Sequence, residues 1–177
     1  GNFWTAAEKE LPLLKKLGMK CADGGHVVQM LCLNPKTEYP YNHPKFKGDE
    51  HKPRDPYALG KEYAGDANGD GKLSNFEAHP EWYGLRKGKR SDNIRDEFGD
   101  NFCTSNADAT KELAKNVVQS LVDGQWRNVD ILNFWMMDGL DRWCECENCK
   151  KQGSNTDRLF VVVHAVLTEI QKARKEG

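Results

Sequence analysis

Residues 129–137 (VDILNFWMM) are the stretch of sequence on which the fold prediction depends. They are mostly apolar and alternate little, which is typical of a parallel strand whose two faces are both covered. One helix is expected between residues 105 and 124, before this strand, and a second over residues 156–175, after it. Strands that alternate with helices predict a parallel sheet with right-handed crossovers.

Polar residues and glycine mark the ends of these two helices. Ser105 or Asn106 suits the N-cap of the first helix, and Gly124 suits its end. Thr156 or Asp157 suits the N-cap of the second. Both helices are therefore predicted with defined boundaries.

The remaining predicted helices and strands all lie before residue 105. Residues 5–17 predict a helix, residues 26–33 (HVVQMLCL) a strand, and residues 101–104 (NFCT) a short strand. Between them, residues 34–100 contain six of the seven prolines, which disfavours long helices and central strands. We expect a long irregular excursion there, with one short helix near residues 75–86.

The predicted fold class is α/β. Residues 1–177 are expected to form a single domain, a partial (β/α) barrel of the TIM type, whose parallel sheet is interrupted by the long excursion at 34–100. The chain begins at Gly1 without a methionine, so we expect a processed piece of a longer chain with other domains.

Composition excludes some classes of partner. The formal net charge of −1 gives no electrostatic basis for binding nucleic acid or an anionic membrane. No apolar run approaches the roughly 20 residues that a membrane-spanning helix needs.

Residues 66–77 (DANGDGKLSNFE) match the calcium-loop pattern position by position. Alternate side chains on a tight loop can supply the hard oxygen ligands that Ca²⁺ prefers. The alternative is an Asx-rich turn in which Ser74 and Glu77 form a capping box for the short helix. The candidate calcium ligands are Asp66, Asn68, Asp70, the Lys72 carbonyl, Ser74 and Glu77.

Three cysteines at C-x-C-x-x-C spacing, Cys144, Cys146 and Cys149, directly follow the 129–137 strand region. Three thiolates this close can bind one tetrahedral Zn²⁺, which needs a fourth ligand. Cys103 is the candidate, because the predicted strands 101–104 and 129–137 could lie near each other in a parallel sheet. A disulfide such as Cys146–Cys149 or Cys103–Cys149 is the alternative, as are reduced cysteines that pack a loop.

Carboxylates and indoles gather where the 129–137 strand ends. Trp135, Asp138, Asp141 and Trp143 lie within nine residues, at the strand end that faces ligands in parallel α/β folds. Sugar sites combine such groups, because indole faces stack on sugar rings and carboxylates bind hydroxyls or act as acid, base or nucleophile. The alternative is that the two aspartates only turn the chain.

A second candidate group consists of three residues of the excursion and one histidine before it. His79, Glu81 and Trp82 occur in the segment HPEWYG, and His26 follows the Gly24-Gly25 pair. Glu81 is a candidate second carboxylate, and His26, His79 and Trp82 are candidate substrate-binding residues. Each histidine can equally be a buried residue with a structural hydrogen bond.

Four separated motifs resemble, in order, a family of uncharacterised glycoside-hydrolase-like barrel domains of secreted bacterial proteins, related to α-glucuronidase-type modules. The motifs are Gly25-His26, HPEWYGLRKGKR (79–90), NFCTSN (101–106) and DGLDRWCECENCKK (138–151), and the resemblance spans about residues 24–170. It implies a TIM-barrel-like fold, a carbohydrate substrate, and a secreted, periplasmic or cell-surface location. The calcium-type loop is not part of the family pattern.

The sequence therefore predicts a carbohydrate-active domain, glycoside-hydrolase-like, that acts at the strand carboxyl ends. Asp138 is the candidate catalytic carboxylate, with Glu81 or Asp141, and Trp135 and Trp143 are candidate sugar-binding residues. The alternative is a non-catalytic carbohydrate-binding or scaffold module stabilised by calcium and the cysteine cluster.

Overall fold

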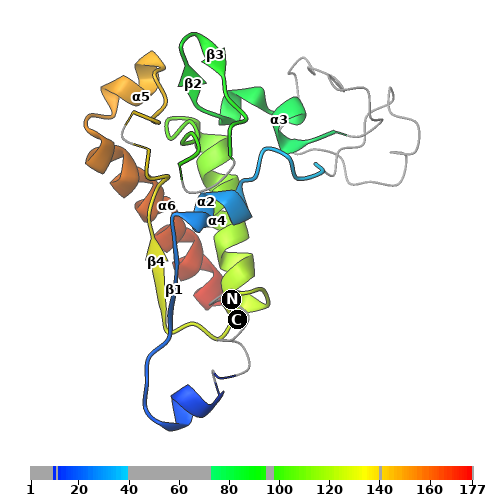
Figure 1. Ribbon diagram of the computed structural model, residues 1–177, viewed down its shortest axis with the longest axis vertical. Coiled ribbons are helices and arrows are strands. Elements are labelled where there is room, and N and C mark those ends of the chain that lie inside the picture. The colour runs from blue at the N-terminus through cyan, green and yellow to red at the C-terminus, as the bar shows by residue number, and fades with distance from the viewer. Residues whose placement is uncertain (1–9, 11, 40–72, 95–97, 140, 177) are drawn as a thin grey trace.

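The computed structural model describes residue 10 and residues 12–39, 73–94, 98–139 and 141–176 (Figure 1). The elements are β1 (Ala22–Gly25), α2 (Val27–Cys32), α3 (Asn75–Ala78), the 3₁₀ helix η1 (Pro80–Trp82), β2 (Leu85–Arg86), β3 (Lys89–Arg90), α4 (Ala107–Val122), β4 (Ile131–Phe134), α5 (Glu147–Lys151) and α6 (Asn155–Glu176).

A two-stranded parallel sheet, β1 beside β4, forms the centre of the α/β architecture. Ala22 pairs with Ile131 and Gly25 with Phe134. Gly24 has φ +98°, and a Cβ at this position would meet the carbonyl oxygen of Asn133 at 2.3 Å. Only glycine therefore allows the two strands to approach this closely. The parallel pairing predicted from residues 129–137 is confirmed, but closure of a barrel is not seen in the described residues.

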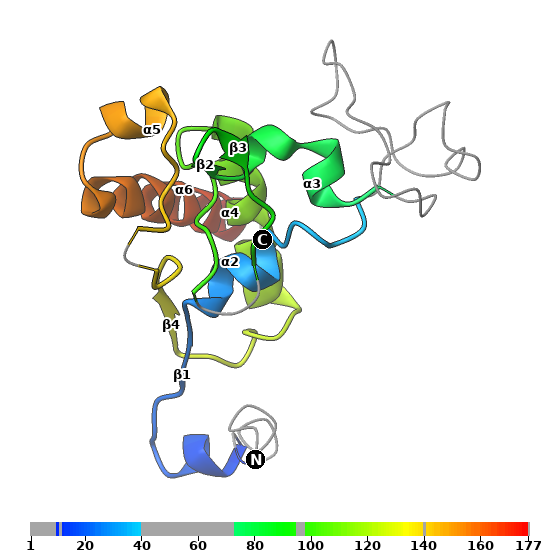
Figure 2. The ribbon, with the colours of Figure 1, turned by 45° about the horizontal axis from the view of Figure 1, so that its top comes forward.

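Helices α4 and α6 pack against each other beside this sheet (Figures 1 and 2). Leu113 and Val117 of α4 and Val162 and Val166 of α6 are buried in one core, and β4 packs against it through Leu132 and Phe134. This is the arrangement of a β–α–β unit in which apolar helix faces cover the sheet. Figure 1 shows α5 and the β2–β3 hairpin beyond the carboxyl ends of β1 and β4.

The two long helices agree with the sequence prediction. The Asn106 side chain caps α4 by accepting a hydrogen bond from the Ala109 N–H at 3.0 Å. The cap of α6 was wrongly predicted, because Ser154 lies before the helix and exchanges hydrogen bonds with Asp157. A capping box of this kind needs Ser at the N-cap and an acceptor three residues later.

Two predicted strands are wrong. Residues 26–33 form helix α2 from Val27 to Cys32, and the strand lies just before it. An apolar run of this length fits a buried helix as well as a strand, and Val28 and Cys32, four residues apart, lie buried on one helix face. The Gly24-Gly25 pair ends the strand with positive φ angles.

The segment 101–104 is not a strand either, because its N–H groups bond to loops and a side chain. Asn101 donates to the Arg142 carbonyl at 2.7 Å and Cys103 to the Trp82 carbonyl at 2.8 Å. Phe102 donates to the Gln29 side chain at 3.2 Å. The segment is thus held among three other parts of the chain.

Within the described residues, each helix is too short or too polar to cross a membrane.

Candidate metal centre and strand-edge site

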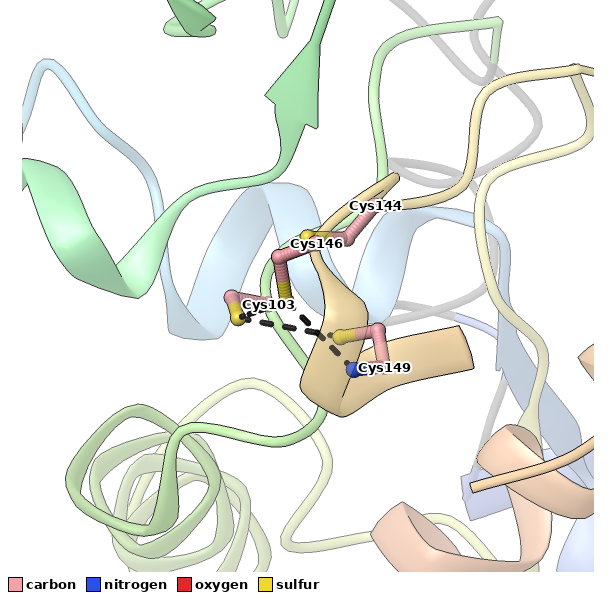
Figure 3. Close-up of side chains that lie close together, drawn as sticks. All are labelled: Cys103, Cys144, Cys146 and Cys149. Atoms are coloured by element: carbon pink, nitrogen blue, oxygen red, sulfur yellow. Dashed lines mark hydrogen bonds between the residues drawn. The ribbon is translucent and has the colours of Figure 1, made fainter. Parts of the chain in front are cut away.

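Four cysteine side chains lie together beyond the carboxyl ends of β1 and β4 (Figure 3). Cys103 comes from the segment before α4, Cys144 and Cys146 from the segment after β4, and Cys149 from α5. All four Sγ atoms lie within 4.8 Å of one another. The Sγ of Cys103 is 3.8 Å from that of Cys146 and 3.7 Å from that of Cys149.

These separations suit a metal and exclude a disulfide. Four sulfurs at about 2.3 Å from a tetrahedral Zn²⁺ lie about 3.8 Å from one another, whereas bonded sulfurs are about 2.05 Å apart. All six cysteines of the chain are free. The disulfide that the sequence left open is therefore not formed, and the buried cluster is consistent with a Zn²⁺-type site. Tetrahedral sulfur ligands are typical of zinc and of iron centres.

Local hydrogen bonds turn the sulfurs toward one point. The Sγ of Cys146 caps α5 by accepting from the Cys149 N–H at 3.4 Å, which the two intervening residues of the C-x-x-C turn make possible. The Ser105 hydroxyl lies 3.2 to 3.6 Å from the sulfurs of Cys103, Cys146 and Cys149. A hydroxyl in this position can donate its one hydrogen to a thiolate, which stabilises the thiolate and orients it as a metal ligand.

The β2–β3 hairpin closes the other side of the cluster. The Leu85 N–H donates to the Sγ of Cys144 at 3.2 Å, and the Leu85 carbonyl accepts from the Glu145 N–H at 2.8 Å. A Cβ on Gly84 would meet the Asn101 carbonyl oxygen at 2.3 Å, so only glycine permits this approach. Three separate segments are thereby fixed around the four sulfurs.

Without a cation the four thiols compete for protons. Hydrogen bonds from Cys103 and Cys144 hold the pKa of Cys149 well below its usual range. The hydrogen bond with Cys103 raises the pKa of Cys144, and the interaction with Cys149 raises it further. One sulfur ionises easily at the expense of its neighbour, because thiolates this close repel each other. Only a bound cation lets all four become thiolate ligands.

A polar cavity of about 230 Å³ lies beside the cluster. Two of the four sulfur-bearing residues, Cys103 and Cys146, reach it, whereas Cys144 and Cys149 do not line it. Its lining residues are Glu81, Arg90, Cys103, Ser105, Asn106, Cys146, Glu147 and Asn148.

A second group lies at the carboxyl edge of the β1–β4 sheet and consists of His26, Trp135 and Asp138. His26 Nδ1 donates a hydrogen bond to the Met136 carbonyl, and its Nε2 lies 4.0 Å from Asp138 Oδ2. The rings of His26 and Trp135 are 5.0 Å apart between centroids. Trp135 is 52% exposed and the Asp138 side chain is 59% exposed, so both can reach a ligand from solvent. We call these three residues the strand-edge group.

The other predicted site residues lie elsewhere. His79 and Trp82 are buried and stack on each other with a centroid distance of 4.1 Å, which makes them part of the core. Glu81 contacts His79 Nδ1 at 3.1 Å and lines the cavity beside the cysteine cluster. Asp138 does not line this cavity. Asp141 is exposed, and Trp143 packs against the main core.

The candidate calcium loop is described only in its last part. Ser74 and Glu77 form a capping box at the start of α3, with the Ser74 N–H donating to Glu77 Oε2 at 2.9 Å. Their alternative interpretation as helix-capping residues is thus confirmed. Calcium binding stays a prediction, because four of its six candidate ligands lie outside the described residues: Asp66, Asn68, Asp70 and Lys72.

Sequence reasoning did not identify three residues around the cysteines: Ser105 as a donor to sulfur, and Arg90 and Arg158 as neighbouring cations. Arg158 gave one signal, since it lies four residues before Val162 and eight before Val166, in line with the buried face of α6. An arginine in such a line needs a buried partner.

Comparison of the whole chain with known proteins gives no match: no family model, no curated protein and no solved structure matches it. The chemistry of the four cysteines and of the strand-edge group is therefore the basis for assigning a function.

Proposed function

We propose that the chain is a carbohydrate-active domain whose ligand site is the strand-edge group, and that Zn²⁺ bound by the four cysteines holds the segment that follows this site. The observation that carries the proposal is the meeting of His26, Trp135 and Asp138 at the carboxyl ends of two hydrogen-bonded parallel strands. Ligands of open α/β sheets and barrels bind at this end of the strands.

The three side chains have the chemistry of a sugar site. The exposed indole of Trp135 offers an apolar face to a sugar ring, and the Asp138 carboxylate accepts hydrogen bonds from hydroxyl groups. His26 donates through Nδ1 to the Met136 carbonyl, which directs its Nε2 toward Asp138. A carboxylate, a ring nitrogen and an aromatic face suit a polyhydroxylated ring.

A partial (β/α) barrel of the TIM type is the proposed fold around this site. The parallel pairing of β1 and β4 and the two helices packed beside them support it. Parallel sheets are found almost only with both faces covered, so a sheet of two strands suits a larger structure built with further βα units of a longer chain. The resemblance of four motifs to glycoside-hydrolase-like barrel domains supports the same fold.

The proposed zinc centre has a structural role. Four cysteine ligands leave no open coordination position, which is typical of structural zinc and not of catalytic zinc. Cys144 follows Asp138 by six residues, so an ion at the cysteines anchors the far end of the loop that begins at the strand-edge group. The metal would supply fixed geometry, and the chemistry at the sugar would come from side chains.

A non-catalytic binding module is the second candidate. Glycosidases need two carboxylates about 5–5.5 Å apart for retention or about 6.5–9.5 Å apart for inversion. Asp138 is the carboxylate of the strand-edge group, whereas Glu81, the second carboxylate that the sequence offered, lines a different cavity whose lining does not include Asp138. The loss of this candidate pair favours binding over hydrolysis.

Binding and reducing-end release on a panel of purified polysaccharides test the proposal. We compare the wild type with Trp135→Ala, Asp138→Asn and the matched control Asp141→Asn, an exposed aspartate on the same loop. The first two variants should weaken binding at least about tenfold and the control should not, since a lost stacking or charged contact is worth over about 1 kcal/mol.

The same panel separates the two candidates. For an enzyme, wild type releases reducing ends and Asp138→Asn lowers the rate by about 10²-fold or more. For a binding module, wild type retains the polysaccharide and releases nothing. Equal behaviour of Asp138→Asn and Asp141→Asn, or no retention and no release on any polysaccharide of the panel, would contradict the proposed site.

A further inference from the structure

Among the residues that the structure describes, two arginines beside the four-cysteine cluster have no carboxylate partner. Arg158 of α6 is only 8% exposed, and its Nη1 donates to the Cys144 carbonyl at 3.1 Å. Its Nε is buried and has no hydrogen-bond partner among the described residues. Arg90 of β3 donates through Nη1 to the Tyr83 carbonyl at 2.8 Å and lies 4.0 Å from the Sγ of Cys144. The two guanidinium groups therefore meet Cys144 at its carbonyl and at its sulfur.

Neighbouring arginines differ from these two. Arg86 lies 3.6 Å from Asp100 and 2.9 Å from Glu145, and Arg142 lies 3.4 Å from Asp100. Neither Arg90 nor Arg158 forms an ion pair with any carboxylate in the part of the chain that the structure describes. The arginines around the cluster thus divide into two that face carboxylates and two that face the cysteines.

A buried guanidinium without a counter-charge is costly, because desolvation is not offset by an opposite charge. Neutral thiols do not supply that charge. Four thiolates around a divalent cation do, because four negative charges and two positive charges leave a net charge of −2 on the centre. Arg158 and Arg90 together carry +2, so these two guanidinium charges are equal and opposite to the net charge of the centre.

We propose that Arg158 and Arg90 are the counter-charges of the four thiolates when these bind a divalent metal. The inference rests on the proposed zinc centre and adds that the charge of Arg158 raises its affinity for the metal. Metal binding and the burial of Arg158 therefore stabilise each other. Arg158 lies in line with Val162 and Val166, so this coupling fastens the start of α6 to the cysteine segment. Arg90 contributes less, because it lies against the cavity and is partly hydrated.

Removing the charge of Arg158 should change the stability of the metal-loaded and metal-free proteins by different amounts, which a role in packing alone would not produce. In the metal-free protein the cysteines carry less negative charge than four thiolates, so removing Arg158 costs that state less than it costs the metal-loaded state. In the metal-loaded protein the same removal takes away a counter-charge of the thiolates. A side chain that only fills space would stabilise both states alike, and its loss would weaken both.

The test measures metal affinity and stability separately. Zn²⁺ and Co²⁺ affinities are obtained by titration against a competing chelator, and urea unfolding is followed in chelator and in excess Zn²⁺. The variants are Arg158→Met, which keeps length and loses charge, Arg158→Lys, which keeps charge and changes shape, and Arg90→Met. Arg174→Met, an exposed arginine on the same helix, is the matched control.

Arg158→Met should lower metal affinity about 10- to 100-fold, the range seen when groups around metal ligands are changed. Arg158→Lys should recover most of this loss, Arg90→Met should lose less, and Arg174→Met should match wild type. The loss of stability of Arg158→Met relative to wild type should be smaller in chelator than in excess Zn²⁺. If the metal-free protein does not fold, the difference between Met and Lys at position 158 still separates charge from shape.

Two results would overturn the inference and are distinguishable. If wild type binds neither Zn²⁺ nor Co²⁺, the proposed metal centre fails and the inference with it. If wild type binds metal and Arg158→Met binds it equally well, or if Arg158→Lys loses as much affinity as Arg158→Met, the metal centre stands and the counter-charge role is refuted.

Discussion

The four-cysteine centre and the strand-edge group lie beyond the same two strand ends but are built in opposite ways. The centre draws its sulfurs from separate segments, buries three of its four cysteines and sets sulfurs 3.7 and 3.8 Å apart. The strand-edge group leaves Trp135 and Asp138 more than half exposed, with one 4.0 Å contact between His26 and Asp138. An ion of fixed geometry suits a closed and oriented ligand set, whereas a sugar needs open faces.

Removing a ligand of the centre should have the largest effect. We expect Cys149→Ser to lower the free energy of unfolding in Zn²⁺ by more than about 4 kcal/mol, because metal binding to a structural site contributes directly to folding. Urea denaturation measures it, and addition of a chelator to wild type should have a similar effect. The control is Cys21→Ser, since Cys21 lies outside the cluster. Equal stability of the two variants would mean that the cluster holds no ion.

Tryptophan substitutions should separate the core from the strand edge. Trp82 is fully buried and stacks on His79, so Trp82→Ala should cost about 3–5 kcal/mol of unfolding free energy. Trp135→Ala should cost less than about 1 kcal/mol, because the indole is half exposed. Thermal and urea unfolding of both variants provide the comparison. A large loss of stability for Trp135→Ala would make that residue structural.

The smallest expected effect concerns Cys32, which lies in neither region. Burial raises the pKa of Cys32 to about 12, partly offset by a hydrogen bond with Ser120. Between its ordinary pKa near 9 and this value the unfolded chain loses the thiol proton and the folded chain keeps it. The stability that Cys32 contributes is therefore present below about pH 9 and is lost as pH rises toward 12.

Two measurements check the Cys32 prediction. In folded protein at pH 9, iodoacetamide should modify the half-buried Cys21 well before Cys32. Replacing Cys32 by Ala should lower stability at neutral pH but flatten the decline in unfolding free energy above pH 9. Alkylation of Cys32 at the rate of Cys21 would show that the thiol is not shielded from solvent.

Sequence periodicity and spacing were sufficient for several features. The apolar stripes and cap signals of α4 and α6 predicted both helices, and the run 129–137 predicted a parallel strand, although β4 is shorter. The C-x-C-x-x-C spacing marked three members of the cysteine cluster, while Cys103 was correctly named as the fourth from a predicted strand at 101–104 that does not form. These features depend on interactions between residues close in sequence or on one short, distinctive motif.

Other features depended on packing between distant segments. The apolar run 26–33 became helix α2 because its Val28–Cys32 face is buried against α4, and the sequence period could not separate that from a strand. Which carboxylates share a site was also beyond the sequence: Asp138 meets His26, and Glu81 faces the cavity beside the cysteines.

The sequence by itself determined where the long helices run, that β4 is a strand of a parallel sheet, and that Cys144, Cys146 and Cys149 gather. Only the tertiary structure decided that Arg158 and Arg90 face those cysteines, with no ion pair to a carboxylate among the described residues, and that Trp82 is buried while Trp135 is exposed. The physical reason is range. Helix stripes, caps and C-x-x-C turns arise from neighbours a few residues apart, whereas burial and charge pairing depend on how segments more than fifty residues apart, such as 85 and 144, pack together.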